Sequence, residues 1–275
     1  YLPQIADGSL RATLAWCDAS GRWDADGVSA TCVRNGEGFT LNGSYRYVVD
    51  GHTADLLVVA ARAPGSSGGA GLSLFVLPAD TAGVTRTWLP TMDQTRKLAE
   101  LRLDNVSVPA EALLGAEGGA HAALGKTLAL ASVALAAEQA GGAQQILDMA
   151  VAYTKERQQF GRAIASFQAI KHKAADMMLK AEAAKSAVYY AACVAQEALT
   201  GGAQGAQLAE AASLAKAYCS DTYFFNAGTA MQLHGGVGFT WEYDVHLYFK
   251  RARASESFLG DAAAHRERIA VELGL

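Results

Sequence analysis

The stretch TKERQQFGRAIASFQAIKHKAADM, from Thr154 to Met177, joins two long helical patterns through a short turn. We expect the first helix to end near Arg157, because Gly161 allows the backbone to leave the helix there. Ser166 is the expected N-cap of the second helix. Apolar residues recur at helical spacing along that second helix, at Phe167, Ile170, Ala174 and Met177. Two long helices joined in this way indicate a helical bundle.

The turn presents a guanidinium, a phenyl ring and an amide, from Arg157, Phe160 and Gln168. A planar, permanently charged guanidinium suits a phosphate or pyrophosphate, because it can donate two parallel hydrogen bonds to such a group. The spacing also allows a simpler interpretation, in which Arg157 pairs with Glu156 or with a helix end. The residues by themselves leave both interpretations open.

A second block is rich in glycine and reads Gln232-Leu233-His234-Gly235-Gly236-Val237-Gly238-Phe239. A glycine-rich turn between helices can direct several backbone N–H groups toward an anion. A plain connection between two helices explains the same glycines equally well.

Taken together, the two blocks resemble motifs of the acyl-CoA dehydrogenase family. The turn from Arg157 to Gly161, followed by Phe167-Gln168, is similar to the family's R-x-x-F-G turn and hydrophobic-Q helix start. The second block, with Glu242-Tyr243 behind it, resembles the family's Q-x-x-G-G-x-G-F loop. The resemblance extends more weakly over the whole chain. It implies a middle β-barrel domain followed by a C-terminal four-helix bundle, with the family's N-terminal helical domain absent from this chain.

The composition is that of a well-packed protein, with 51% hydrophobic and 18% charged residues in a chain of 275. The formal net charge of -4 argues against nucleic acid as the main partner. No apolar run is long enough to span a membrane. The four cysteines are scattered without a C-x-x-C motif, which favours reduced thiols and a cytoplasmic location. The six histidines show no paired ligand spacing, so we expect no metal site.

The first 115 residues read as short strands separated by turns, without intervening helices. One of the turn signals is Asn42-Gly43, which we expect to separate two strands. Many strands at close spacing predict an antiparallel β-barrel or sandwich. The expected strands are residues 10–17, 27–33, 39–41, 45–49, 56–61, 72–77, 84–89 and 98–103.

From about Gly118 the sequence is alanine-rich and helical to its end. The longest helical pattern, residues 121–156, is expected to be interrupted at Gly141-Gly142. The other expected helices are residues 166–198, 206–233, 241–257 and 261–273. We therefore predict an α+β protein, with a middle β-barrel domain at residues 1–115 and a C-terminal helical bundle domain at residues 116–275.

The resemblance implies FAD as the cofactor. It assigns Arg157, Phe160 and Gln168 to the ADP portion of FAD, with Arg157 pairing with the pyrophosphate. It adds an amide and backbone N–H groups from Gln232, Gly235 and Gly236 to the same portion. In this family such residues reach the flavin of a neighbouring subunit, so they indicate that the chain can complete a flavin site.

The residues that would hold the flavin ring depart from the family pattern. Family members carry a T-E-P-G-x-G-S-D loop after the first barrel strand, and counting back from Asn42-Gly43 places this loop at Cys17 to Asp24. Cys17 replaces the threonine and Trp23 the serine. The family's W-x-T motif reads Tyr47-Val48-Val49 here, and valine cannot supply a hydroxyl. The alternative is that the loop alignment slips by one residue.

Both positions that carry the catalytic base in this family lack a carboxylate. The usual position, before a glycine ahead of the last helix, is Leu259, and the position used by some relatives on the first long helix is Ala131. The carboxylate nearest to Ala131 is Glu138, about two turns or roughly 10 Å along the helix. The simpler interpretation of Glu138 is a buried or paired helix residue. Glu256 is a weaker candidate.

The expected function is α,β-dehydrogenation of an acyl-CoA thioester by an FAD-dependent hetero-oligomer in which this chain is the base-lacking subunit. The resemblance implies a homologous acyl-CoA dehydrogenase subunit as partner, in a heterotetramer, and an electron-transfer flavoprotein as electron acceptor. Heterotetrameric members of the family that act on steroid side-chain CoA thioesters provide the pattern, which suggests a role in steroid degradation. Two alternatives are a self-contained FAD-dependent enzyme with a displaced base at Glu138 and a flavin-free structural subunit.

Overall fold

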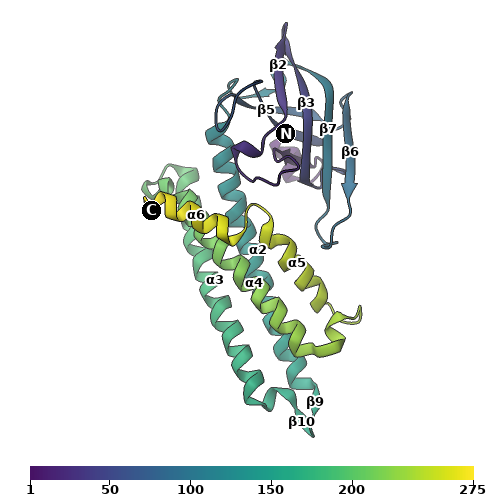
Figure 1. Ribbon diagram of the computed structural model, residues 1–275, viewed down its shortest axis with the longest axis vertical. Coiled ribbons are helices and arrows are strands. Elements are labelled where there is room, and N and C mark those ends of the chain that lie inside the picture. Colours follow the sequence, from purple (N-terminus) through teal and green to yellow (C-terminus); the bar gives the residue numbers. More distant parts are fainter. The chain divides into compact units, whose positions relative to one another are not determined.

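The computed structural model describes residues 1–275, which form two compact units, Tyr1–Gly125 and Lys126–Leu275 (Figure 1). The first unit holds the main sheet and the second is helical, which confirms the predicted α+β fold. The long helix α2 (His121–Glu156) begins shortly before the division between the units. The expected domain boundary after residue 115 falls just before α2 begins.

The first unit is built on an eight-stranded sheet with the strand order β6-β7-β3-β2-β4-β5-β8, and β1 pairs with β4 beside this path. Most pairs are antiparallel, as expected, but β4 pairs in parallel with both β1 and β2. In the core, the rings of Phe39 and Phe75 pack edge to face with centroids 5.0 Å apart. The strands are β1 (Ala12–Ala15), β2 (Thr31–Asn35), β3 (Gly38–Val49), β4 (Leu56–Arg62), β5 (Leu72–Pro78), β6 (Val84–Leu89), β7 (Leu98–Pro109) and β8 (Leu113–Leu114), and a short helix α1 (Leu2–Ala6) precedes them.

The predicted turn at Asn42-Gly43 is wrong, because β3 continues through both residues. The pairing of β3 with β7 shifts register there, which is the mark of a β-bulge. Gly43 has φ +144°, and a Cβ atom at this position would lie 2.6 Å from the Ala30 Cα. The glycine therefore allows a close approach of two backbone segments within the sheet rather than a hairpin.

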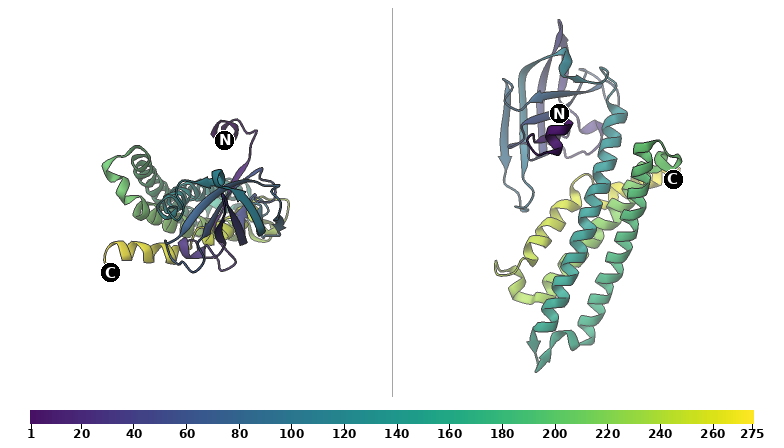
Figure 2. Two further views of the ribbon diagram at one scale, coloured as in Figure 1. Left: turned by 90° about the horizontal axis from the view of Figure 1, so that it is seen from above. Right: turned by 180° about the vertical axis from the view of Figure 1, so that it is seen from behind.

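The second unit contains the long helices, and Figure 2 shows α2 and α3 side by side, joined at one end by a small hairpin of β9 and β10. Fully buried alanines such as Ala184 on α3 and Ala211 and Ala215 on α4 let these helices approach closely. No helix is both long and apolar enough to cross a membrane. Besides α2, the helices are α3 (Gln168–Thr200), α4 (Leu208–His234), α5 (Val245–Ser257) and α6 (Ala262–Glu272).

The predicted interruption of α2 at Gly141-Gly142 is also wrong, since the helix runs unbroken for 36 residues. Glycine in a helix interior costs about 1 kcal/mol relative to alanine. The second glycine has a packing role, because a Cβ atom on Gly142 would lie 2.5 Å from the ring of Tyr223 on α4. Gly141 has open space beside it.

Candidate cofactor site

The segment that joins α2 to α3 is a tight hairpin rather than a simple exit from a helix. Strands β9 (Gln158–Gln159) and β10 (Arg162–Ala163) pair in antiparallel fashion around Phe160 and Gly161. Both turn residues have positive φ, +55° and +78°, which is the pattern of a type I′ hairpin turn. This conformation costs a bulky residue about 1–2 kcal/mol, and Phe160 is nonetheless 92% exposed. A strained, exposed phenylalanine is typical of a functional position.

Arg157 lies directly after α2, and its backbone is fixed while its side chain is free. Its N–H donates to the Tyr153 carbonyl and its own carbonyl accepts from the Ile164 N–H, both at 2.8 Å. The guanidinium is exposed and makes no ion pair or hydrogen bond within the chain. It is therefore not paired with Glu156 or with a helix end. A nearby arginine, Arg162, instead lies over the Phe167 ring at 4.1 Å.

Gln168 is the first residue of α3, a helix of 33 residues. Phe167 occupies the N-cap position and offers no side-chain cap, so the expected cap at Ser166 is wrong. The Ser166 hydroxyl donates instead to the Ala163 carbonyl at 2.7 Å. The first N–H groups of a long helix carry partial positive charge, and here no side chain of the chain caps them.

The end of α4 lies against the same hairpin end of the unit. Lys173 on α3 donates to the Gln232 side-chain oxygen at 3.2 Å, and the rings of Tyr153 and His234 stack with centroids 4.1 Å apart. Burial lowers the pKa of His234, whose Nδ1 lies 2.8 Å from the Ala230 carbonyl. The two sequence blocks therefore meet at one end of the bundle, which we call the open end: Arg157, Phe160, Gln168, Lys173, Gln232, Gly235 and Gly236. Lys173 was missed in the sequence, where the only signal was a lysine-rich face of this helix.

The glycines of the open end differ in what they contribute. Gly235 ends α4 with φ +63° and ψ -145°, a conformation that glycine adopts without strain. Its N–H already donates to the carbonyls of Met231 and Gln232, so this group serves the helix end. Both Gly235 and Gly236 are exposed, with open space where a Cβ atom would lie. They therefore leave the backbone accessible to a ligand.

The positions that would carry a base show no free carboxylate. Leu259 is buried and has φ +63°, and its carbonyl lies 3.1 Å from the His265 Nε2. Ala131 is a half-buried residue of α2. Glu138 accepts a hydrogen bond from the Arg251 Nε at 2.9 Å, as part of an ion pair. No group of three or more His, Cys, Asp or Glu side chains could hold a metal ion.

In the first unit, aromatic side chains occupy the loop that was aligned with the flavin-ring motif. The Trp23 ring lies between those of Trp16 and Tyr47, with centroid distances of 5.8 and 6.0 Å. Burial raises the pKa of Cys17 to about 11, so this thiol stays protonated at neutral pH. Val49 presents only its backbone carbonyl, which accepts from the Thr13 hydroxyl at 2.7 Å. None of these side chains offers the aliphatic hydroxyl that threonine and serine supply in the family loop, and Tyr47 carries only a phenolic one.

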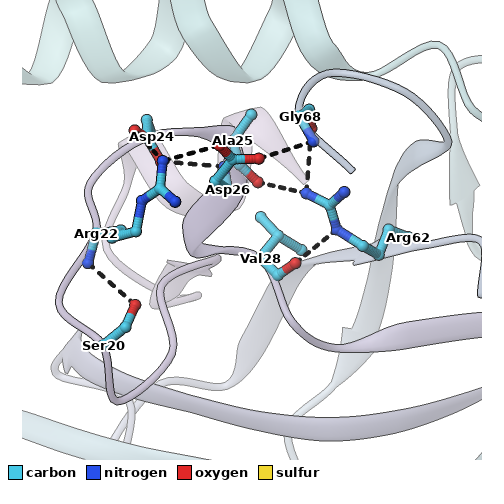
Figure 3. A network of polar contacts seen from close by, with 8 residues as sticks. All are labelled: Ser20, Arg22, Asp24, Ala25, Asp26, Val28, Arg62 and Gly68. Atoms are coloured by element: carbon cyan, nitrogen blue, oxygen red, sulfur yellow. Dashed lines mark hydrogen bonds and ion pairs between the residues drawn. The ribbon is translucent and has the colours of Figure 1, made fainter. Parts of the chain in front are cut away.

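The polar groups of this loop bind one another (Figure 3). Arg22 pairs with Asp24 and Asp26 at 3.1 and 2.8 Å. Asp26 also accepts from the Gly68 N–H at 2.7 Å. The buried Arg62 donates to the backbone carbonyls of the two neighbouring loops, those of Val28, Ala25 and Gly68, at 2.6, 2.6 and 3.1 Å. The charged side chains of the loop are thus already paired with one another and with neighbouring segments of the first unit.

Comparisons with known proteins match both units. The family model "Acyl-CoA dehydrogenase, middle domain" matches residues 13–106, and "Acyl-CoA dehydrogenase, C-terminal domain" matches residues 117–274. An acyl-CoA dehydrogenase of Bacillus subtilis is 33% identical over 94% of this chain and 67% of its own length. The caffeyl-CoA reductase-Etf complex subunit CarC of Acetobacterium woodii is 32% identical over the same shares. The structure of butyryl-CoA dehydrogenase from Megasphaera elsdenii superimposes with a TM-score of 0.91, at 30% identity, over 100% of this chain and 71% of that one.

Members of the matching family are FAD-dependent flavoproteins. The open end fits the ADP portion of FAD, because a free guanidinium, an uncapped helix start and accessible glycine backbone all suit a pyrophosphate. The loop around Trp23 does not fit a flavin ring, because aromatic side chains fill it and its charged side chains are already paired. The one unpaired group there is Nε1 of Trp16, which is buried. Of the two candidate regions, only the open end therefore offers an unpaired charged side chain to the cofactor.

Proposed function

Because this chain belongs to the acyl-CoA dehydrogenase family, we propose that it is the base-lacking subunit of a hetero-oligomer and completes the FAD site of a homologous subunit. In this proposal Arg157 binds the pyrophosphate, with Phe160, Gln168 and Gln232 beside the rest of the ADP portion. When bound, FAD supplies the hydride acceptor for α,β-dehydrogenation of an acyl-CoA thioester.

The observation that carries the proposal is the state of Arg157. Its backbone is held by two hydrogen bonds, yet its guanidinium has no partner in the chain. A charged group on a fixed backbone position, without an internal ion pair, can bind an anion without first breaking a contact of its own chain. Lys173, five residues into α3, adds a second positive charge at the open end.

The proposal assigns the proton-abstracting base to the partner subunit. Leu259 and Ala131 have no acidic group, and the Glu138 carboxylate is held by Arg251. A general base must reach the substrate proton with a free, unprotonated group. The alternative of a self-contained enzyme with Glu138 as base requires this ion pair to open.

The substrate class is an acyl-CoA thioester, and we propose an electron-transfer flavoprotein as electron acceptor. The relative whose name includes an Etf complex supports this choice of acceptor. Fatty acyl-CoA and steroid side-chain CoA thioesters are the two substrate types to compare in the assembled protein. Faster flavin bleaching by the steroid side-chain thioester would support a role in steroid degradation.

The decisive experiment measures flavin per chain, with the chain expressed alone and together with a homologous acyl-CoA dehydrogenase subunit. We expect no flavin in the chain alone and about one flavin per pair of chains in the complex, which bleaches on anaerobic addition of acyl-CoA. About one flavin per chain that bleaches without a partner would establish the self-contained enzyme. A complex in which this chain adds no flavin would establish the structural subunit.

A further inference from the structure

A buried lysine lies under the turn that joins α5 to α6. Lys216 on α4 is 0% exposed, and no carboxylate forms an ion pair with it. Its Nζ donates to the Ser220 hydroxyl at 2.8 Å and to the carbonyls of Glu256 and Gly260 at 3.1 and 3.0 Å. All three N–H donors of the ammonium group therefore have partners, and two of these partners are backbone carbonyls, one in the last turn of α5 and one in the turn that follows.

Two other helices bind carbonyls around the same turn. Gln139 on α2 donates through Nε2 to the Ser255 carbonyl at 3.1 Å, and also reaches the Ser220 hydroxyl at 3.1 Å. His265 on α6 lies with Nε2 3.1 Å from the Leu259 carbonyl. Four carbonyls at the end of α5 and in the turn thus accept from buried side chains of α2, α4 and α6.

We call Lys216, Gln139 and His265 the clamp, and the backbone that they bind has an unusual conformation. Leu259 has φ +63° and is followed by Gly260 at φ +103°. A leucine in the left-handed region is costly and persists only where its surroundings over-determine it. The hydrogen bonds from Lys216, Gln139 and His265 stabilise this conformation, because each side chain comes from a different helix and binds different carbonyls around the turn.

We infer that Lys216 is a positioning residue, which with Gln139 and His265 presets the backbone at Leu259 and Gly260. The clamp keeps one fixed turn geometry at the position where the family places its catalytic glutamate. The use of this turn beside an acyl-CoA site rests on the proposed function, whereas the clamp itself belongs to this chain alone. Burial lowers the pKa of Lys216 to about 8, so the deprotonation of this amine falls in a pH range that experiments can cover.

The charged and titratable groups around Lys216 come from three elements. They are Cys219 and Asp221 on α4, Glu256 on α5, and Asp261, His265 and Arg268 at the start of α6 and along it. The two acids nearest the turn, Glu256 and Asp261, favour the protonated amine, while burial disfavours it. The side chain that α2 contributes, Gln139, does not titrate.

Hydrogen–deuterium exchange on the full chain, without FAD or partner, tests the clamp. We expect Lys216→Met to speed exchange of the amides between residues 257 and 265 about tenfold, while those of the α3 core around Ala184 and Ala191 stay as in the wild type. Gln139→Leu should act in the same direction. Lys180→Met, which removes a partly exposed lysine over the Phe225 ring, is the matched control and should leave the turn unchanged.

A pH series separates positioning from general packing. After correction for intrinsic exchange, protection of the turn in the wild type should rise through a step that begins near pH 8, because opening that exposes Lys216 to water restores its ordinary pKa and takes up a proton. Lys216→Met should lack that step. Unchanged turn protection in Lys216→Met, uniform loss over the whole helical unit, or a missing step in the wild type would each overturn the inference. None of these results depends on flavin content, so failure of the clamp and failure of the proposed function can be told apart.

Discussion

The open end around Arg157 and the α5–α6 turn around Leu259 differ in whether their polar groups have hydrogen-bond partners within the chain. Lys216 and Gln232 mark the two regions on α4, about 24 Å apart along the helix axis. At the open end the Arg157 guanidinium has no partner within the chain, no side chain caps the start of α3, and the glycines leave open space beside the backbone. At the turn, carbonyls and a buried ammonium group satisfy one another. Free polar groups at one region and paired ones at the other indicate where this chain meets a ligand.

The same contrast holds for the loop around Trp23 in the first unit. Arg62 is buried and donates to three backbone carbonyls, much as Lys216 does in the helical unit. In both cases a buried cation without a direct carboxylate partner organises a loop aligned with a functional motif of the family. Both loops carry a large apolar or aromatic residue, Leu259 or Trp23, at the aligned functional position. The departures from the family pattern thus lie in segments whose backbone carbonyls are hydrogen-bonded to buried side chains.

Acid should break the closed turn before it affects the open end. Burial lowers the pKa of His265 to about 4, with Arg268 and Lys216 contributing. The unfolded state binds this proton near pH 6.5, so the free energy of unfolding should fall by about 3 kcal/mol as the pH drops from 6.5 to 4. His265→Gln, which keeps a donor for the Leu259 carbonyl, should flatten this dependence in denaturant titrations. His172→Gln, at an exposed position on α3, should not; equal pH dependence in all three proteins would contradict the prediction.

Removal of the free charge should weaken the open end specifically. Arg157→Ala should lower FAD retention in the assembled complex by about 10- to 100-fold, because one charge-assisted, bidentate contact contributes about 1.5–3 kcal/mol. Flavin fluorescence after dilution measures the effect. Arg266→Ala removes an exposed arginine that already pairs with Asp221 and is the control. Equal retention in the two variants would place the pyrophosphate elsewhere.

The scaffold between the two regions can be tested at adjacent glycines of α2. Gly142→Ala should destabilise the chain by about 1–3 kcal/mol, because its methyl group would overlap the Tyr223 ring. Gly141→Ala should stabilise it by about 1 kcal/mol, since space is open there and alanine is the better helix former. Thermal unfolding of the pair gives the comparison, and the same sign for both would show that Tyr223 does not limit the site.

The smallest expected effect separates stability from function at the hairpin. Phe160→Gly should relieve the positive φ and stabilise the chain by about 1 kcal/mol. It should also reduce FAD retention, because it removes the exposed ring from the open end. Thermal unfolding and flavin retention are measured on the same samples. A stabilised variant with unchanged retention would make Phe160 a residue of the turn alone.

The order of elements and most of the candidate site followed from the sequence. The change from short strands to alanine-rich helices predicted a β unit followed by a bundle, and the predicted ends of the long helices lie within four residues of the observed ones. Arg157, Phe160, Gln168 and the Gln232 block are local motifs, so they could be recognised without knowing the fold. The hairpin of β9 and β10 was missed, although Phe160-Gly161 is a short-range turn signal.

The tertiary structure decided what depends on contacts between distant residues. The bulge at Gly43 depends on Ala30, the unbroken course of α2 on Tyr223, and the parallel pairing of β4 on strands from two other segments. Whether a charge is free or paired is decided in the same way. The Arg157 guanidinium has no partner, while Glu138 pairs with Arg251 and Lys216 donates to carbonyls 40 and 44 residues further along the chain. A sequence determines which groups a chain carries and its local periodicity, whereas long-range packing determines which of those groups remain unsatisfied.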